Sequence, residues 1–157
     1  MTALAGVLEG YCRVYEDLLV LARRKRDILL GGRPQDLEPV VQAEEVLLGR
    51  LGGLERELAD ARRGMAGEPD AADAPLAAVL DQLEPAERQR VEALGSRLRS
   101  VIEDLRAVGE ENVNLLRQAL QFVEFSISLL ERTTAGATYR ASGRLAHVRG
   151  PVVDHRA

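Results

Sequence analysis

"VEALGSRLRSVIEDLRAVGEENVNLLRQALQFVEFSISLL", residues 91–130, decides the fold, because its apolar residues recur at alternating steps of three and four. This heptad spacing is typical of helices that pack side by side as in a coiled coil. The series runs Val91, Leu94, Leu98, Val101, Leu105, Val108, Asn112, Leu115, Ala119, Phe122, Ser126, Leu129. The stretch predicts one long helix over 85–132, with Pro85 at its first turn.

The last part of this helix is more apolar than one packing seam requires. At about 100° per residue, the apolar residues from Leu115 to Leu130 cover an arc of roughly 220°, whereas a surface helix needs about 100°. The helix would measure about 72 Å, against about 40 Å for each earlier helix, so roughly 20 residues near 113–132 overhang them. A kink at Gly109 could instead fold this segment back. In either case the sequence predicts an apolar face that requires a partner.

Two shorter helices, over 3–30 and 36–62, precede the long one. "GGRP", residues 31–34, ends the first helix, and Asp36 is a suitable N-cap for the second. So tight a connection makes the two helices an antiparallel hairpin, in which the numbers of facing residues add up to about 69. This register pairs Lys25 with Glu44, the two charged residues that interrupt the apolar series. The alternative is that Lys25 extends its ammonium into water and Glu44 is solvated.

The segments together predict an all-α protein without strands. A hairpin over 3–62, a linker over 63–75, a short helix over 76–83 and the long helix over 85–132 form one helical domain, 1–132, in a coiled-coil-like bundle. Residues 133–157 read as a flexible basic tail, since they are poor in leucine and carry an excess of arginine over acid.

Composition excludes several classes of protein. The net charge of −4 over 157 residues argues against nucleic-acid binding, and no apolar run is long enough to span a membrane. The start of the chain lacks the basic leader of a secretory signal. Cys12 is the only cysteine, so the chain has no internal disulfide and suits a reducing compartment such as the cytoplasm. Its apolar neighbours indicate a packed small side chain and not a nucleophile.

The residues needed for catalysis are also missing from the predicted helices. Both histidines, His147 and His155, lie in the basic tail, so no helix offers a metal-binding set. The sequence contains no glycine-rich phosphate loop and no nucleophile–histidine pair on a common scaffold. We therefore expect a protein that is not an enzyme and uses no metal and no cofactor.

The order of segments resembles the FlgN-type flagellar export chaperones. Members of that family carry Asn-x-x-Leu-Leu in their last long helix, matched here by Asn112, Leu115 and Leu116. Behind it they carry Tyr-Gly-x-x-Gly, matched by Tyr139 and Gly143 within "TYRASGR". Arg140 replaces the first glycine of that motif, so a tight turn after Tyr139 is not expected. The resemblance extends over nearly the whole chain.

The resemblance implies a cytoplasmic chaperone of the flagellar type III export system. Its clients would be the hook–filament junction proteins, which it protects from aggregation and delivers to the export gate. The client would bind the C-terminal amphipathic region. The side chains expected to contact it lie mainly on the flank of the heptad seam: Leu116, Leu120, Val123, Phe125, Ile127, Leu130 and Tyr139.

A second hypothesis is structural. The protein could be a homo-oligomeric coiled-coil or adaptor protein whose face over 115–130 is permanently buried against a second copy. The two hypotheses are compatible if weak self-association covers the face until a client arrives. The sequence does not choose between them.

Overall fold

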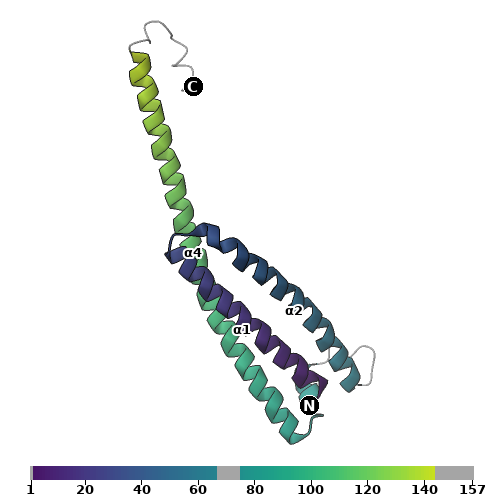
Figure 1. The fold of residues 1–157 in the computed structure, drawn as a ribbon. Coiled ribbons are helices and arrows are strands. Elements are labelled where there is room, and N and C mark those ends of the chain that lie inside the picture. The colour runs from purple at the N-terminus through teal and green to yellow at the C-terminus, as the bar shows by residue number, and fades with distance from the viewer. Residues whose placement is uncertain (1, 67–74, 144–157) are drawn as a thin grey trace. The chain divides into compact units, whose positions relative to one another are not determined.

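The computed structural model is all-α in the part of the chain that it describes, residues 2–66 and 75–143 (Figure 1). Its elements are α1 (Ala3–Leu30), the 3-10 helix η1 (Pro34–Asp36), α2 (Leu37–Ala66), α3 (Leu76–Leu80) and α4 (Pro85–Gly143). The chain divides after Leu115 into two compact units. The first unit holds the helical hairpin and the first half of α4, and the second begins at Leu116.

The hairpin agrees closely with the sequence-based prediction. Helix α1 has the predicted bounds, and α2 begins directly after Asp36 but ends at Ala66 instead of 62. The short helix α3 occupies the first residues of the segment predicted over 76–83. Most of the predicted linker, residues 67–74, lies outside the described residues.

The turn between α1 and α2 shows why the helix stops at two glycines. The Gly32 N–H donates to Leu29 O and the Arg33 N–H donates to Ile28 O, which together form a Schellman motif. This motif places Gly32 at φ +66°, in the left-handed region that other residues adopt only with strain. The glycine pair therefore ends α1 and reverses the chain.

Helices α1 and α2 pack through one shared cluster of apolar side chains. Val7, Val14 and Leu18 from α1 are buried with Leu54 from α2. A Cβ atom on Gly10 would lie 2.7 Å from Leu54 Cδ2, so α1 offers a hollow for that leucine. The remaining members of the cluster are partly buried: Tyr11, Tyr15, Leu47, Leu51, Leu58 and Leu105. Tyr11 with Leu58 and Leu18 with Leu51 are pairs that the predicted register brings together.

The predicted charge pair is present at the edge of this hairpin. Lys25 Nζ lies 2.6 Å from Glu44 Oε2, and each side chain is about one-fifth exposed, at 21% and 20%. Partial exposure keeps both groups hydrated, so the pair contributes little net stability. The contact instead favours one register of the hairpin over its neighbours.

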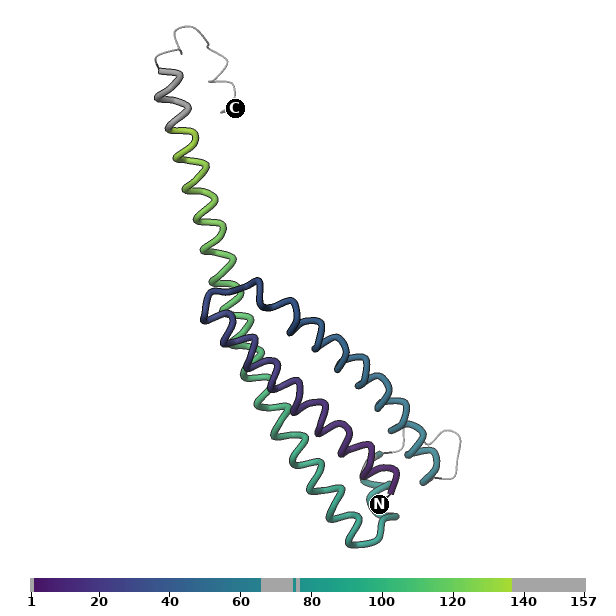
Figure 2. Tube along the Cα trace, in the orientation of Figure 1, coloured from purple at the N-terminus to yellow at the C-terminus, as the bar shows by residue number. Residues whose placement is uncertain are grey.

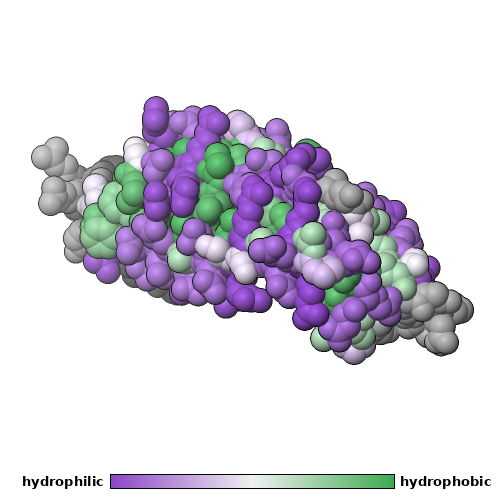
Figure 3. Space-filling model, turned by 90° about the horizontal axis from the view of Figure 1, so that it is seen from below, coloured by the Kyte–Doolittle hydropathy of each residue, from purple (hydrophilic) through white to green (hydrophobic). Residues whose placement is uncertain are grey.

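Within the first unit, α1 lies between α2 and the first half of α4 (Figures 1 and 2). Leu4 and Ala5 of α1 are buried with Val91 of α4 and with Val79 of the short helix α3. Further along, Leu19 and Ala22 are buried with Val108. The near-constant separation in sequence between these partners shows that α1 and α4 run parallel. Figure 3 shows, on the face that it presents, a mainly hydrophilic surface with smaller hydrophobic areas between the hydrophilic residues.

The long helix differs from the prediction at its end. Helix α4 continues to Gly143, so residues 133–143 are helical and do not belong to a non-helical tail that starts at 133. Arg140 stands inside this helix, where a glycine would favour a break. Helical structure also continues through Gly109, so the chain does not fold back there. Residues 144–157 lie outside the described residues, and the predicted flexibility of that tail stays a prediction.

Candidate protein-binding surface

The candidate surface is formed by the apolar side chains of α4 beyond Leu115. Phe122 is 70% exposed and Leu130 is 67% exposed. We call this surface the apolar arc; its other exposed members are Leu116, Leu120, Val123, Phe125, Ile127 and Leu129. Scattered apolar residues are normal on protein surfaces, but so many on consecutive turns of one helix are typical of an interaction site.

The apolar arc leaves only a narrow polar sector on the helix. At about 100° per residue, the charged residues of this segment all fall within a sector of roughly 100°. They are Arg117, Glu124, Glu131 and Arg132. The charges therefore face one side, and the rest of the circumference is apolar except for Ser126, Thr133 and Gln118, which lies between Phe125 and Leu129 on the helical wheel.

The hydroxyl groups within the arc do not interrupt its apolar character. Ser126 Oγ donates to Phe122 O and Thr133 Oγ1 donates to Leu129 O, both at 2.8 Å. Each hydroxyl is thus satisfied by a carbonyl of its own helix. A partner that covers these residues does not leave their donors without an acceptor.

In this segment the heptad seam is as exposed as its flank. Phe122 and Leu129 continue the heptad series, yet they are as exposed as the flank residues Leu120 and Ile127. Ala119 is exposed as well. The whole arc is therefore available, and the six flank residues expected to bind a client form only part of it.

Tyr139 is the one expected contact residue whose side chain the structure does not describe. Its backbone belongs to α4, which ends at Gly143. Described side chains in this helix end with residue 136. The role expected for Tyr139 stays a prediction.

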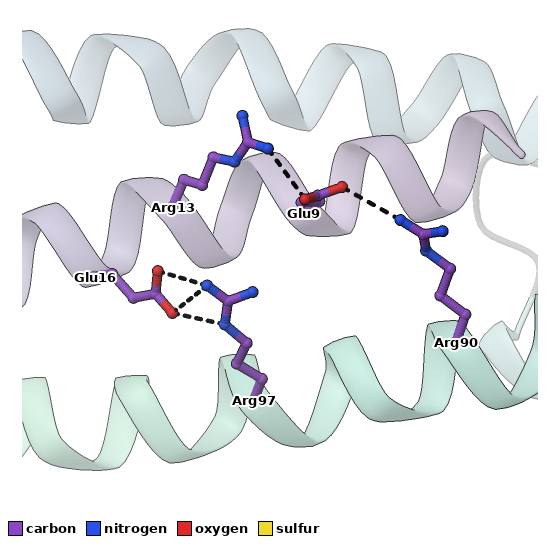
Figure 4. A network of polar contacts seen from close by, with 5 residues as sticks. All are labelled: Glu9, Arg13, Glu16, Arg90 and Arg97. Atoms are coloured by element: carbon purple, nitrogen blue, oxygen red, sulfur yellow. Dashed lines mark hydrogen bonds and ion pairs between the residues drawn. The ribbon is translucent and has the colours of Figure 1, made fainter. Parts of the chain in front are cut away.

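Polar contacts between α1 and α4 hold the half of α4 that precedes the arc. Arg97 Nε and Nη2 donate to the two carboxylate oxygens of Glu16 at 2.6 and 2.7 Å, which raises the pKa of the Arg97 guanidinium (Figure 4). Glu9 lies 3.0 Å from Arg13 of its own helix and 3.6 Å from Arg90 of α4. The Glu16–Arg97 and Glu9–Arg90 pairs join the two helices and favour one register of α4 on α1.

Asn112 makes the most buried polar contact of this interface. It is 5% exposed, and its Nδ2 donates to Ala22 O at 2.9 Å. Its Oδ1 is buried without a hydrogen-bond partner in the described residues. Asn112 belongs to the heptad series, but this contact was not predicted, although a polar residue in a packing seam is itself a signal of register control.

Cys12 has the structural role predicted for it. The side chain is fully buried, and Sγ lies 3.5 Å from Leu94 O of α4. Burial raises the pKa of the thiol, which lowers its reactivity as a nucleophile. Among the described residues no group of three or more His, Cys, Asp or Glu side chains could hold a metal ion. None of the described helices is long and apolar enough to cross a membrane.

Fold and surface together define an all-α protein whose long helix α4 exposes an apolar arc. The family model of the FlgN protein matches residues 1–147, so the chain belongs to the FlgN family. This is a family of flagellar export chaperones and not of enzymes. The chain is also similar to the uncharacterized protein YvyG of Bacillus subtilis strain 168, with 25% identity over 128 residues, which cover 82% of this chain and 79% of that protein. No solved structure matches the chain.

Proposed function

We propose that this protein binds hook–filament junction proteins in the cytoplasm and delivers them to the flagellar type III export gate. The observation that carries the proposal is the exposed apolar arc on α4, from Leu116 to Leu130. Membership of the FlgN family supports the chaperone role. The identity of the client comes from the resemblance to that family.

The physical basis is the transfer of apolar surface out of water. Each leucine, valine, isoleucine or phenylalanine that a partner buries contributes about 1.5–3 kcal/mol before the cost of association. A client whose helical ends carry matching apolar stripes would bury them against the arc as a helix does in a groove. The same contact removes the client's exposed apolar surface from water, which prevents the client from aggregating.

Tyr139 is proposed as a further contact beyond the arc. A tyrosine combines a large apolar ring with a hydroxyl that remains satisfied at a wet boundary. Such a residue suits a position where one end of the side chain is covered by a partner and the other stays in water. Substituting Tyr139 with Ser should weaken client binding less than substitutions within the arc.

The structural hypothesis is the second candidate. It is favoured by the heptad series, which continues without a change of phase to Leu129 although Phe122 and Leu129 are exposed. A second copy of the chain would supply an identical series and could form a coiled coil with it. In that case the arc would be buried in a dimer and closed to clients.

One experiment separates the two candidates. The mass of the full chain is measured by light scattering over a dilution series, with and without a junction protein of the same cell, and affinity is measured by calorimetry. The chaperone proposal predicts a complex with the junction protein that persists on dilution. A dimer that persists on dilution and ignores the junction protein would establish the structural role instead.

A further inference from the structure

We infer that the apolar arc accommodates two client helices side by side, one along each edge, so that α4 becomes one member of a small bundle. This inference rests on the proposed function, because it specifies the form of the client at the same surface. It follows from the width of the arc, the charges along its edges and the small side chains at its centre.

The two edges of the arc are too far apart for one helix. We define the Leu120 edge as Leu116, Leu120 and Ile127, and the Phe125 edge as Phe122, Phe125 and Leu129. At about 100° per residue, the two edges are centred roughly 170° apart around α4. A single packed helix covers a stripe of about 100°, so it reaches one edge and leaves the other in water. Both edges are similarly exposed, with Leu120 and Phe125 at 61% each.

Opposite charges border the two edges. On the helical wheel Glu124 and Glu131 lie next to the Leu120 edge, and Arg132 lies next to the Phe125 edge. None of the three forms an ion pair with another described residue. A client helix along the Leu120 edge would therefore carry Lys or Arg beside its apolar stripe, and one along the Phe125 edge would carry Asp or Glu.

The centre of the arc leaves room for the line where two helices would meet. Ala119 and Ser126 are the residues closest to the middle of the arc, and both are small. Small side chains let helices approach closely, and the Ser126 hydroxyl already donates within α4. Neither residue obstructs a pair of partners that flank it.

Paired substitutions on the two edges test the inference. Leu120→Ala/Ile127→Ala alters one edge and Phe125→Ala/Leu129→Ala alters the other, while Gln121→Ala in the polar sector is the matched control. Each variant is titrated in the full chain with an intact junction protein and with its N-terminal and C-terminal helical segments separately. We expect each edge variant to weaken binding of the intact protein at least about tenfold, and the control to leave it unchanged. Each isolated segment should respond to one edge variant only.

The outcomes separate this inference from the proposed function. If the junction protein binds but one edge pair has no effect on its affinity, a single helix occupies the arc and the inference is overturned while the proposed function stands. A complex that contains two copies of this chain, with the second copy on one edge, also overturns it. If no junction protein binds the unaltered chain, the proposed function itself fails.

Discussion

Helix α4 has two halves with the same sequence pattern and opposite surroundings. In the first half the heptad residues are buried or partly buried, with Val91 at 3% and Val108 at 8% exposure. In the second half Phe122, at the same kind of position, is 70% exposed. The spacing of three and four residues continues through both halves without a break. The two halves therefore share their heptad spacing and differ in what surrounds their heptad residues.

A heptad pattern therefore indicates that a helix needs a partner but does not indicate where that partner comes from. The first half finds its partner in α1, through Leu19, Ala22 and the Asn112 amide. In the second half the heptad residues Phe122 and Leu129 are 70% and 45% exposed. The same kind of substitution should therefore have different effects in the two halves. In the covered half it should lower the stability of the fold, and in the exposed half it should weaken the binding of a partner.

The largest expected effect concerns the exposed half. The fourfold variant Leu116→Ser, Leu120→Ser, Val123→Ser, Ile127→Ser should weaken client binding by several orders of magnitude, since each side chain contributes about 1.5–3 kcal/mol when a partner buries it. The melting temperature should change little, because these residues are exposed in the unbound chain. Calorimetric titration and thermal unfolding measure the two effects. A large fall in melting temperature with retained affinity would show that this flank is core.

The next prediction compares the loss of stability when a valine is replaced by alanine in each half of α4. Val108→Ala should lower the free energy of unfolding by about 1.5 kcal/mol or more, because two buried methylene equivalents at about 0.8 kcal/mol each are lost and a cavity remains. Val123→Ala, at a residue that is 51% exposed, should change stability by less than about 0.5 kcal/mol. Urea unfolding of both variants measures the difference. Equal losses of stability would mean that the two halves are equally covered.

A smaller effect is expected where the covered half ends. Asn112→Leu removes a buried amide whose Oδ1 has no partner in the described residues, so stability should stay within about 1 kcal/mol of the unaltered chain. Polar residues in a packing seam specify register and partner number, so the variant should self-associate more readily. Thermal unfolding and light scattering report the two properties. A strong loss of stability would make the hydrogen bond to Ala22 O a major contributor to the fold.

The hairpin could be predicted from sequence because its signals are local. The glycine pair at 31–32 fixes the turn, the turn fixes the antiparallel register, and the register brings Lys25 to Glu44. The exposed face was predictable for a similar reason, since the width of the arc and the lengths of the helices are properties of the sequence alone. Both predictions depend on counting residues and not on details of packing.

Other features depend on where side chains lie in space and were missed. The contact of Asn112 with Ala22 O joins residues 90 positions apart, and the Glu16–Arg97 pair joins residues 81 apart. No local pattern specifies which of many surface charges meet across two helices. The end of α4 was placed too early because Thr133 and Gly136 disfavour helix, whereas an established helix adds a residue at little cost. The exposure of Phe122 likewise depends on whether another surface packs against the second half of α4, and no local pattern specifies that.

The smallest expected effect is a pH dependence confined to the covered half. Glu87 Oε1 accepts hydrogen bonds from the Thr2 hydroxyl at 2.6 Å and from the Thr2 N–H at 2.8 Å, and these bonds lower the pKa of the Glu87 carboxyl in that order of importance. A lowered pKa in the folded state means that the contact stabilises the fold above the ordinary glutamate pKa and that this contribution disappears as pH falls through the folded value. Glu87→Gln keeps an acceptor oxygen but removes the charge, so its melting temperature should lie slightly below that of the unaltered chain at neutral pH. The two curves should meet in acid.

Client affinity should not change in the variant, because Glu87 belongs to the first half of α4 and the arc to the second. A gap between the two melting curves that widens on acidification would contradict the assigned direction of the pKa shift.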